Sequence, residues 1–281
     1  MVGRRDFLRT LSGAALGALA SRCGSESTAS GARRLDRIGL QLYTVRSRMA
    51  TDFQGTLDRV AEIGYREVEF AGYFEHDPAE VKSALANAGL KAPAAHVPLE
   101  LVRDDMPRLL DAATTIGHRW LVVAWIPEEE RSADGYRSVV DTFNHAGEEA
   151  WAAGLRFAYH NHDFEFADLE GRPAYDFLLE MSDPERVEFE LDLYWITHGG
   201  RDPLDYFERY PGRFPLVHVK DSAGPPQHRM VEVGAGVIDF AKIFARSERA
   251  GMQHYFVEHD NPQDPLASIA ASYDYLSNLS F

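Results

Sequence analysis

The sequence is poor in cysteine, in basic residues and in long apolar runs. Cys23 is the only cysteine among 281 residues, so no disulfide can form within the chain and its stability must come from a packed core. Lys and Arg number 29 against 44 Asp and Glu, which gives a formal net charge of −15. Such a chain lacks the basic surface that binds nucleic-acid phosphates or anionic membranes. The composition therefore argues against nucleic acid or a membrane surface as a partner.

The apolar run near the N-terminus, Leu11–Ala20, is too short to cross a membrane as a helix. It follows the pair Arg4 and Arg5 and then Phe-Leu-Arg, a pattern that resembles a twin-arginine export signal. We expect cleavage after Ala20 and export to the periplasm or the cell exterior. An amphipathic N-terminal helix is the alternative.

The residues after this signal predict a spacer and then one domain. Residues 21–34 are rich in Ser, Gly and Ala and lack periodicity, which is typical of a flexible linker. A lipid anchor at Cys23 is a weaker alternative, because Arg22 stands where a lipoprotein cleavage site has a small residue. No second linker follows, so residues 35–281 are expected to form a single domain.

Short β-rich runs alternate with helical spacing along this domain. The eight predicted strands are Ile38–Val45, Glu67–Phe70, Ala92–Val97, Trp120–Ile126, Arg156–His162, Val187–Trp195, Leu216–Lys220 and Tyr255–His259. The clearest helical stripes cover residues 53–63, 81–88, 106–116 and 139–151, and a glycine suited to a helix cap follows each of them. The helices after the fifth and sixth strands are expected to be shorter.

Alternating strands and helices predict a parallel β/α fold. Eight such units in a domain of this size favour a closed (β/α)₈ barrel, the TIM barrel. A doubly wound sheet is the alternative, but it would usually carry a glycine-rich loop after its first strand. The first strand here runs instead into Tyr43-Thr44-Val45-Arg46.

Polar residues gather at the ends of the predicted strands, where a barrel has its active site. They are Glu67, Glu69, His96, His160, His162, Glu165, Glu188, Glu190, Asp192, His218, Lys220, Asp221, Glu258, His259 and Asp260. Residues two apart on a strand face the same side. Three such pairs are His160 with His162, Glu190 with Asp192, and His218 with Lys220. We expect this polar set to point into the barrel mouth.

Imidazoles and carboxylates from four strands indicate a site for one divalent cation. The predicted ligands are His160, Asp192, His218 and Glu258. These side chains suit Mn²⁺, Zn²⁺, Fe²⁺ or Co²⁺, with Mg²⁺ as a further candidate. The alternative is a network of internal ion pairs at the mouth of a barrel that binds a sugar without reacting.

Several motifs carry a resemblance to a known family. They are Gly39–Tyr43, His160–Glu165, Leu191-Asp192, His218–Asp221, Gly234 and Gly236 with Asp239-Phe240, and Glu258–Asp260. With them, residues 36–281 resemble the xylose isomerase-like barrel superfamily, in the branch of sugar phosphate isomerases and epimerases. The resemblance implies a metal-dependent barrel that acts on a sugar.

The ketose 3-epimerases of this superfamily hold their metal with Glu, Asp, His and Glu from strands five to eight. The last three match Asp192, His218 and Glu258, whereas the first falls on His160. A second departure is Trp195, where the epimerases place a substrate-binding histidine. The superfamily also holds inosose dehydratases, hydroxypyruvate isomerases, lyases of 3-keto-glycosides and endonucleases of abasic DNA. The acidic charge opposes the last of these.

The resemblance implies that a base removes the proton beside a carbonyl and that a cation stabilises the resulting enediolate. We expect Glu258 to be the base and His162 or Lys220 the acid, although an ion pair with Glu190 or Asp221 is the alternative role for Lys220. The candidates for substrate binding are Glu69, His96 and Glu165 for hydroxyl groups, and Trp195, Trp125 and Tyr43 for the sugar ring.

The expected function is isomerisation or epimerisation of an unphosphorylated sugar or keto-sugar. The alternatives are elimination from a 3-keto-glycoside or an inosose, and a non-catalytic sugar-binding barrel. We expect a small carbohydrate as the partner, and a homo-oligomer is compatible with the sequence.

Overall fold

The computed structural model describes residues 32–281. The predicted export signal, Cys23 and most of the predicted linker lie outside these residues. Arg33, near the end of that linker, exchanges two backbone hydrogen bonds with Phe281, at 2.8 and 3.0 Å. The chain thus already contacts the barrel at Arg33. Within the described residues, no helix is long and apolar enough to cross a membrane.

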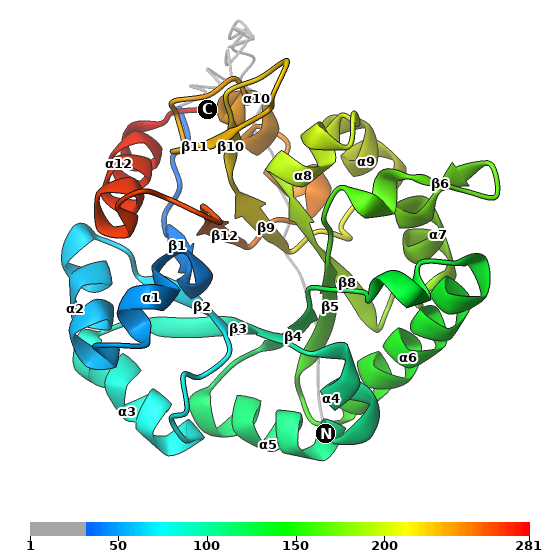
Figure 1. Cartoon of the computed structure of the whole chain (residues 1–281), viewed down its shortest axis with the longest axis horizontal. Helices are drawn as coiled ribbons and strands as arrows, with labels where there is room; N and C mark the ends of the chain where they lie inside the picture. Colours follow the sequence, from blue (N-terminus) through cyan, green and yellow to red (C-terminus); the bar gives the residue numbers. More distant parts are fainter. Residues whose placement is uncertain (1–31) are drawn as a thin grey trace, which may run out of the picture. The chain divides into compact units, whose positions relative to one another are not determined.

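Eight parallel strands close into a barrel with helices around it, which confirms the predicted fold (Figure 1). The strands are β1 (Gly39–Gln41), β2 (Glu67–Ala71), β3 (Lys91–Val97), β4 (Trp120–Val123), β5 (Arg156–His160), β8 (Val187–Asp192), β9 (Leu216–Val219) and β12 (His254–Val257). They follow one another in chain order, and β1 pairs with both β2 and β12 to close the ring. Two small hairpins lie outside it, β6 (Asp168–Leu169) with β7 (Arg172–Pro173) and β10 (Asp221–Ser222) with β11 (Met230–Val231).

The helices that cover the barrel include the four that the sequence predicts most clearly. The α-helices are α1 (Arg46–Met49), α2 (Phe53–Ile63), α3 (Pro78–Ala88), α4 (Leu99–Asp104), α5 (Met106–Ile116), α6 (Ala133–Ala152), α7 (Ala174–Met181), α8 (Leu193–His198), α9 (Pro203–Arg209), α10 (Phe240–Phe244), α11 (Ser247–Ala250) and α12 (Pro265–Asn278). Three short 3₁₀ turns are η1 (Leu42–Val45), η2 (Glu128–Glu130) and η3 (Phe164–Phe166). The first helices after the fifth and sixth strands of the barrel, α7 and α8, are short as expected, with 8 and 6 residues.

Two predicted strands are wrong in their second halves, because a polar side chain turns the chain early. In Ile38–Val45, β1 ends at Gln41, whose Oε1 accepts the Tyr43 backbone N–H at 3.0 Å and starts η1. In Val187–Trp195, β8 ends at Asp192. Its Oδ1 accepts the backbone N–H groups of Tyr194 and Trp195, the second and third residues of α8, at 2.9 and 2.8 Å. The predicted fourth and fifth strands likewise end earlier, at Val123 and His160.

An apolar layer fills the barrel interior below its mouth. It consists of Ala94, Trp120, Val122, Ala158, Leu216 and Phe256, all buried. The alternate residues of the same strands, such as Leu121 and Val217, belong to the larger core between the sheet and the helices. The strand parity predicted from the sequence is therefore confirmed, and the inward positions above this apolar layer belong to the polar residues.

Two acids that we grouped with the mouth lie at the opposite end of the barrel. Glu67 is the first residue of β2 and pairs with Arg37 and with His254, the first residue of β12. Glu188, near the start of β8, pairs with Arg156. The prediction was wrong here because these residues stand at the beginnings of their strands. All eight parallel strands begin at the N-terminal end of the barrel, opposite the mouth.

Candidate active site

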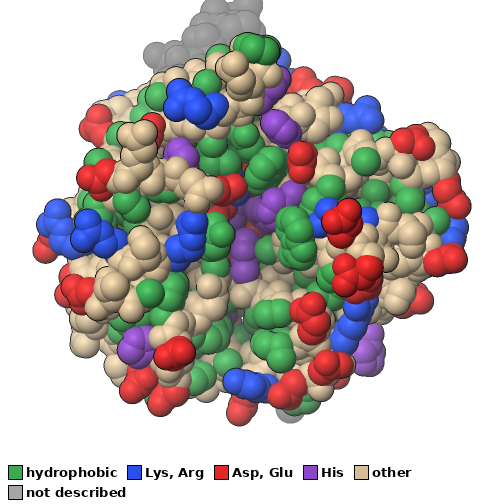
Figure 2. Space-filling model, in the orientation of Figure 1, with side chains coloured by type: hydrophobic (Ala, Val, Ile, Leu, Met, Phe, Trp, Pro, Cys, Tyr) green, Lys and Arg blue, Asp and Glu red, His purple; other side chains and the backbone are tan. Residues whose placement is uncertain are grey.

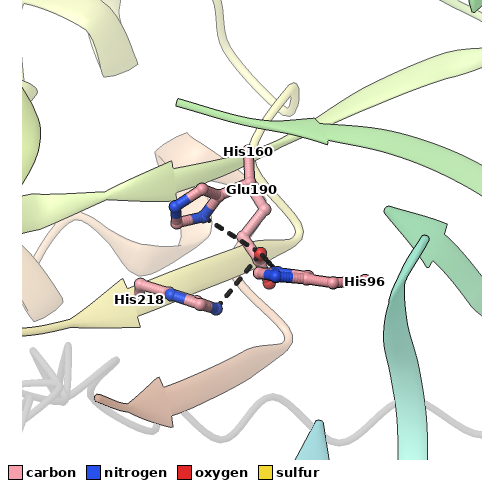
Figure 3. A group of neighbouring side chains, drawn as sticks. All are labelled: His96, His160, Glu190 and His218. Atoms are coloured by element: carbon pink, nitrogen blue, oxygen red, sulfur yellow. Dashed lines mark hydrogen bonds and ion pairs between the residues drawn. The ribbon is translucent and has the colours of Figure 1, made fainter. Parts of the chain in front are cut away.

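Three imidazoles from three strands converge on one carboxylate at the barrel mouth (Figure 3). His96 lies on β3, His160 ends β5 and His218 lies on β9, while Glu190 comes from β8. Glu190 Oε2 lies 2.8 Å from His96 Nε2. The same oxygen lies 3.2 Å from His160 Nδ1 and 3.1 Å from His218 Nε2. The register explains the arrangement, because His160 and Glu190 face each other across β5 and β8.

Glu69 of β2 completes this group, which we call the inner cluster: Glu69, His96, His160, Glu190 and His218. Glu69 Oε2 lies 2.7 Å from His218 Nε2 and 3.3 Å from His96 Nε2. It also accepts a hydrogen bond of 2.9 Å from the Gln41 side chain, which the register of β1 places beside Glu69. The carboxylates of Glu69 and Glu190 are fully buried. The inner cluster therefore holds two buried acids among three imidazoles.

A second group, the outer cluster, consists of Asp192, Lys220, Glu258 and Asp260. Lys220 Nζ lies 2.7 Å from Glu258 Oε2, 2.9 Å from Asp260 Oδ1 and 3.1 Å from Asp192 Oδ2. We named Glu190 and Asp221 as alternative ion-pair partners of Lys220, and this prediction is wrong. Glu190 belongs to the imidazoles, and Asp221 Oδ2 accepts the backbone N–H groups of the two glycines in the Gly-x-Gly loop, at 2.9 and 3.0 Å.

The four predicted metal ligands are neighbours but fall into two groups that share His218. Donor atoms of Asp192, His218 and Glu258 lie within 4.8 Å of one another. His160 instead groups with His96, Glu190 and His218, and its Nε2 lies 3.8 Å from Asp192 Oδ2. His218 joins the groups because Nε2 faces the inner cluster while Nδ1 lies 2.8 Å from Glu258 Oε2.

Several buried polar atoms of these groups, which could act as metal ligands, lack a hydrogen-bond partner in the described part of the chain. They include Glu69 Oε1 and Glu190 Oε1. Two further atoms, His160 Nδ1 and Asp192 Oδ2, have ion-pair neighbours at 3.2 and 3.1 Å but no hydrogen bond of good geometry. A buried polar atom without a partner is costly. Imidazole and carboxylate are the ligands that divalent transition metals take in proteins. The residues present therefore fit the divalent cation that the sequence predicts.

Opposing charges set the protonation of the clusters. Burial alone would lower the pKa of His96, but Glu69 and Glu190 overcome it and raise this pKa to about 9. Burial would likewise lower the pKa of His218, which Glu190 and Glu258 raise well above its ordinary value. His160 has the opposite shift, since burial and the neighbouring His218 lower its pKa. Without a metal, two protonated imidazoles thus partly compensate the buried acids.

The acid and base that we predicted lie in contact. Burial would raise the pKa of Glu258, but Lys220 and His218 hold it well below its ordinary value. Burial would lower the pKa of Lys220, but Asp192 and Glu258 raise it well above its ordinary value. At neutral pH the site therefore holds a carboxylate and an ammonium 2.7 Å apart.

His162 stands in an aromatic surround beside the outer cluster. Its ring is stacked on Phe164 with an interplanar angle of 10° and meets Trp125 edge-on at 5.2 Å between centroids. Trp195 lies 5.6 Å from the same ring, and Lys220 Nζ lies 5.8 Å from the centroid of Trp195. Burial and the Lys220 charge lower the pKa of His162 to about 3. The ring is therefore a neutral imidazole near neutral pH.

The predicted hydroxyl binders have different surroundings. Glu165 is fully buried, where its carboxyl group accepts hydrogen bonds from the Tyr159 hydroxyl and, at 2.9 Å, from the His162 backbone N–H. Its carboxylate thus holds the loop after β5. Glu69 is also committed to protein contacts in the inner cluster. His96, in contrast, lines two cavities of about 1090 and 400 Å³, the smaller of which also includes Trp125.

The mouth is accessible from one face of the molecule. Figure 2 shows histidine side chains in the hollow at the centre of this face. Tyr43 is 41% exposed and Trp125 is 52% exposed, so both can present an aromatic face to a ligand. A small polar molecule could thus reach His96 from the cavities.

The sequence analysis missed two features of the site. Gln41 orients Glu69, and the only signal for it was the Gly39–Tyr43 motif. Glu190 was grouped with the polar set but left out of the predicted ligands, because Asp192 carries the family resemblance at that strand. The spacing of two between them was the available signal, since it puts both on the inner face.

A closed parallel barrel with buried histidines and carboxylates at the C-terminal ends of its strands has the architecture of a barrel enzyme. The model of the family described as xylose isomerase-like TIM barrel matches residues 57–279. The chain belongs to this family.

The similar proteins include dehydratases and a sugar phosphate isomerase/epimerase. The inosose dehydratase of Geobacillus kaustophilus is 25% identical over 264 residues, which cover 78% of this chain and 82% of that protein. A sugar phosphate isomerase/epimerase from Parabacteroides distasonis is 27% identical with a TM-score of 0.77, and the match covers 89% of this chain and 96% of that one. A probable 3-DHS dehydratase from Bacillus anthracis has a TM-score of 0.71 at 14% identity, covering 86% and 99%, and supports the fold. Together these comparisons support an enzyme of the isomerase, epimerase or lyase kind, as expected.

Proposed function

We propose that this chain is a metal-dependent lyase that eliminates water or an alcohol from an unphosphorylated keto-cyclitol or keto-sugar. Elimination was one of the alternatives that the sequence left open. The observation that carries the proposal is the contact of 2.7 Å between the Glu258 carboxylate and the Lys220 ammonium, beside donor atoms suited to a cation. A base and an acid in contact can serve the two halves of an elimination on one face of a substrate.

Glu258 acts in the first half. It is ionised at neutral pH and can accept a proton from the carbon beside the substrate carbonyl. A divalent cation bound at the mouth would polarise that carbonyl and so acidify the adjacent C–H. Asp192, His218 and Glu258, or the residues of the inner cluster, would hold it.

Lys220 acts in the second half. As the bond from the β-carbon to oxygen breaks, the leaving oxygen takes a proton from the ammonium, and a carbon–carbon double bond conjugated to the carbonyl forms. Asp192 and Asp260 contact Lys220 Nζ at 3.1 and 2.9 Å and hold it in place. Because Glu258 touches the same nitrogen, the proton that it accepted can pass back to Lys220 and reset the site.

The walls of the mouth favour an uncharged ring. The five carboxylates of the two clusters, of which four are buried and Asp260 is partly exposed, would repel a phosphorylated substrate. Trp125 and Tyr43 offer exposed aromatic faces for the C–H groups of a sugar ring. His162 Nδ1 is buried without a described hydrogen-bond partner, which suits it to a substrate hydroxyl. This arrangement supports a polar, neutral, ring-shaped substrate.

Isomerisation or epimerisation is the second candidate, and the similarity to the Parabacteroides distasonis isomerase/epimerase supports it. It shares the proton abstraction by Glu258 and differs only in where the proton returns. The replacement of the strand-five glutamate by His160 disfavours epimerisation, because the epimerases use that glutamate as their second acid/base group.

The test is incubation of the metal-loaded protein in D₂O with inososes, 3-keto-glycosides and ketoses. We expect metal-dependent deuterium exchange beside the carbonyl and an unsaturated ketone detected by its ultraviolet absorbance. A stereoisomer in place of the unsaturated product would show an epimerase. No exchange with any substrate after metal addition would overturn both candidates and leave a sugar-binding barrel.

A further inference from the structure

We infer that the divalent cation binds at the inner cluster, through three imidazoles and the Glu190 carboxylate. In the outer cluster, the Lys220 ammonium already serves as the cation. This differs from the Glu, Asp, His and Glu position of the ketose 3-epimerases. The inference rests on the metal dependence within the proposed function.

The first support is the geometry of the donor atoms. Donor atoms of His96, His160, Glu190 and His218 all lie within 4.8 Å of one another. Ligands at about 2.1 Å from a tetrahedral ion would lie roughly 3.4 Å apart. This is close to the distances between Glu190 Oε2 and the three imidazole nitrogens. The three nitrogens come from three strands of a closed barrel and point at one place, as Figure 3 shows.

The second support is the charge in the inner cluster. The described polar contacts of Glu69 and Glu190 are with Gln41 and with imidazoles, and include no lysine or arginine. Glu69 Oε1 and Glu190 Oε1 are buried and have no hydrogen-bond partner in residues 32–281. Two buried carboxylates need a compensating charge. Here that charge must come from protons on the imidazoles or from a divalent cation that replaces those protons.

The outer cluster differs because a lysine ammonium already lies among its carboxylates. Lys220 is 2% exposed and its ammonium contacts Asp192, Glu258 and Asp260 within 3.1 Å. A divalent ion bound to Asp192 and Glu258 would stand against this ammonium in a buried place, where like charges repel strongly. The ammonium would have to leave its three partners before such an ion could bind.

The donor set also selects the metal. Three imidazoles and one carboxylate suit Zn²⁺, Co²⁺ or Fe²⁺, whereas the single imidazole and the carboxylates of the outer cluster would suit Mn²⁺ or Mg²⁺ better. His96 opens onto both cavities. His96 is thus the ligand through which this site borders the cavities.

The decisive measurement counts the imidazoles on the metal in the unaltered protein. The metal-free chain is loaded with one equivalent of Cu²⁺ or Co²⁺, and pulsed electron paramagnetic resonance or X-ray absorption counts the coordinated imidazoles. We expect three. One imidazole would place the ion in the outer cluster and would overturn the inference, and so would two, from His160 and His218.

A matched pair of variants gives an independent answer. Glu190→Gln and Asp192→Asn each remove one buried charge from the same strand, two residues apart. Co²⁺ affinity should fall more than ~100-fold in Glu190→Gln but by no more than ~10-fold in Asp192→Asn, whose side chain would only neighbour the ligands. The reverse order would overturn the inference. Should Glu190→Gln fail to fold, His96→Gln replaces it, because His96 lies at the rim of the site and is absent from the epimerase ligand set.

These results are separable from the proposed reaction. Metal-dependent exchange in D₂O with a single imidazole on the ion would keep the proposed function and reject the inner site. Absence of any bound Co²⁺ together with metal-free turnover would reject the inner site and the metal dependence, and would keep the elimination.

Discussion

The two ends of the barrel use the same kinds of residues to different effect. At the N-terminal end, Glu188 accepts a hydrogen bond of 2.6 Å from the Trp120 indole and pairs with Arg156. At the mouth, one lysine pairs with three carboxylates, whereas Glu69 and Glu190 contact only Gln41 and imidazoles, and each has a buried oxygen without a hydrogen-bond partner among the described residues. The N-terminal end, where Glu67 also pairs with Arg37 and His254, is a closed network that stabilises the fold.

The difference shows that charge balance, rather than residue type, marks the functional end. Buried carboxylates that are each paired with a basic side chain need no ligand. Buried carboxylates without such a partner must bind a cation or destabilise the fold. The following four predictions test this contrast, beginning with the largest expected effect.

Glu258→Gln should lower the turnover of the proposed substrate by about 1000-fold, because it removes the base at the mouth. The protein should stay folded by circular dichroism, since glutamine keeps the shape of the side chain. Deuterium exchange beside the carbonyl is the measurement. Exchange within tenfold of the unaltered protein would exclude Glu258 as the base.

Lys220→Met should reduce kcat about 100-fold through loss of the acid. It should also destabilise the protein by about 3 to 5 kcal/mol, because three carboxylates lose their buried partner. Urea unfolding and steady-state kinetics measure the two effects. Added divalent cation should restore stability but not turnover, and full recovery of both would contradict the role of Lys220 as the acid.

Glu165→Gln should change how stability depends on pH. Burial raises the pKa of Glu165 to about 8, despite its bonds to Tyr159 and His162. A carboxyl with a raised folded pKa favours folding below its unfolded pKa, near 4.5, and loses this contribution as the pH rises through about 8. The loss is at most about 5 kcal/mol. Unfolding at pH 5 and pH 8 should show a smaller decrease in the variant, and an equal decrease in both proteins would contradict the buried, proton-binding state.

Glu188→Gln should have the smallest effect, on stability alone. The variant keeps an oxygen for the Trp120 indole but leaves Arg156 without its acid, at a cost of about 1 to 3 kcal/mol. Its kcat should equal that of the unaltered protein, because Glu188 lies at the end of the barrel opposite the mouth. A large loss of kcat would break the distinction between the two ends.

The barrel could be predicted from the sequence because its signals are local. Glycines after the helical stripes, short β-rich runs and strand parity were enough for the ring of eight strands. The strand ends at Gln41 and Asp192 were not predictable in this way. Whether a polar side chain continues a strand or caps the next turn depends on a backbone N–H two residues further along.

The sequence predicted which residues meet at the candidate site, but it did not predict how they divide into the inner and outer clusters. His160, Asp192, His218 and Glu258 lie together as expected, but the sequence shows neither that His160 joins Glu190 nor that Lys220 enters the outer cluster. Side-chain direction within a layer depends on the stagger between neighbouring strands. That stagger, as between His160 and Glu190 or between Asp192 and His218, is a property of the closed barrel.

His218 has one ring shared by two clusters, with Nε2 toward Glu69 and Nδ1 toward Glu258. An imidazole that donates an electron pair through one nitrogen can carry its proton only on the other. Any cation ligated by Nε2 would thus leave the N–H of the ring directed at the carboxylate proposed as the base. Occupancy of one cluster and the basicity of the other would then be thermodynamically coupled. The factor by which the cation changes the proton affinity of Glu258 must equal the factor by which protonation of Glu258 changes the affinity for the cation.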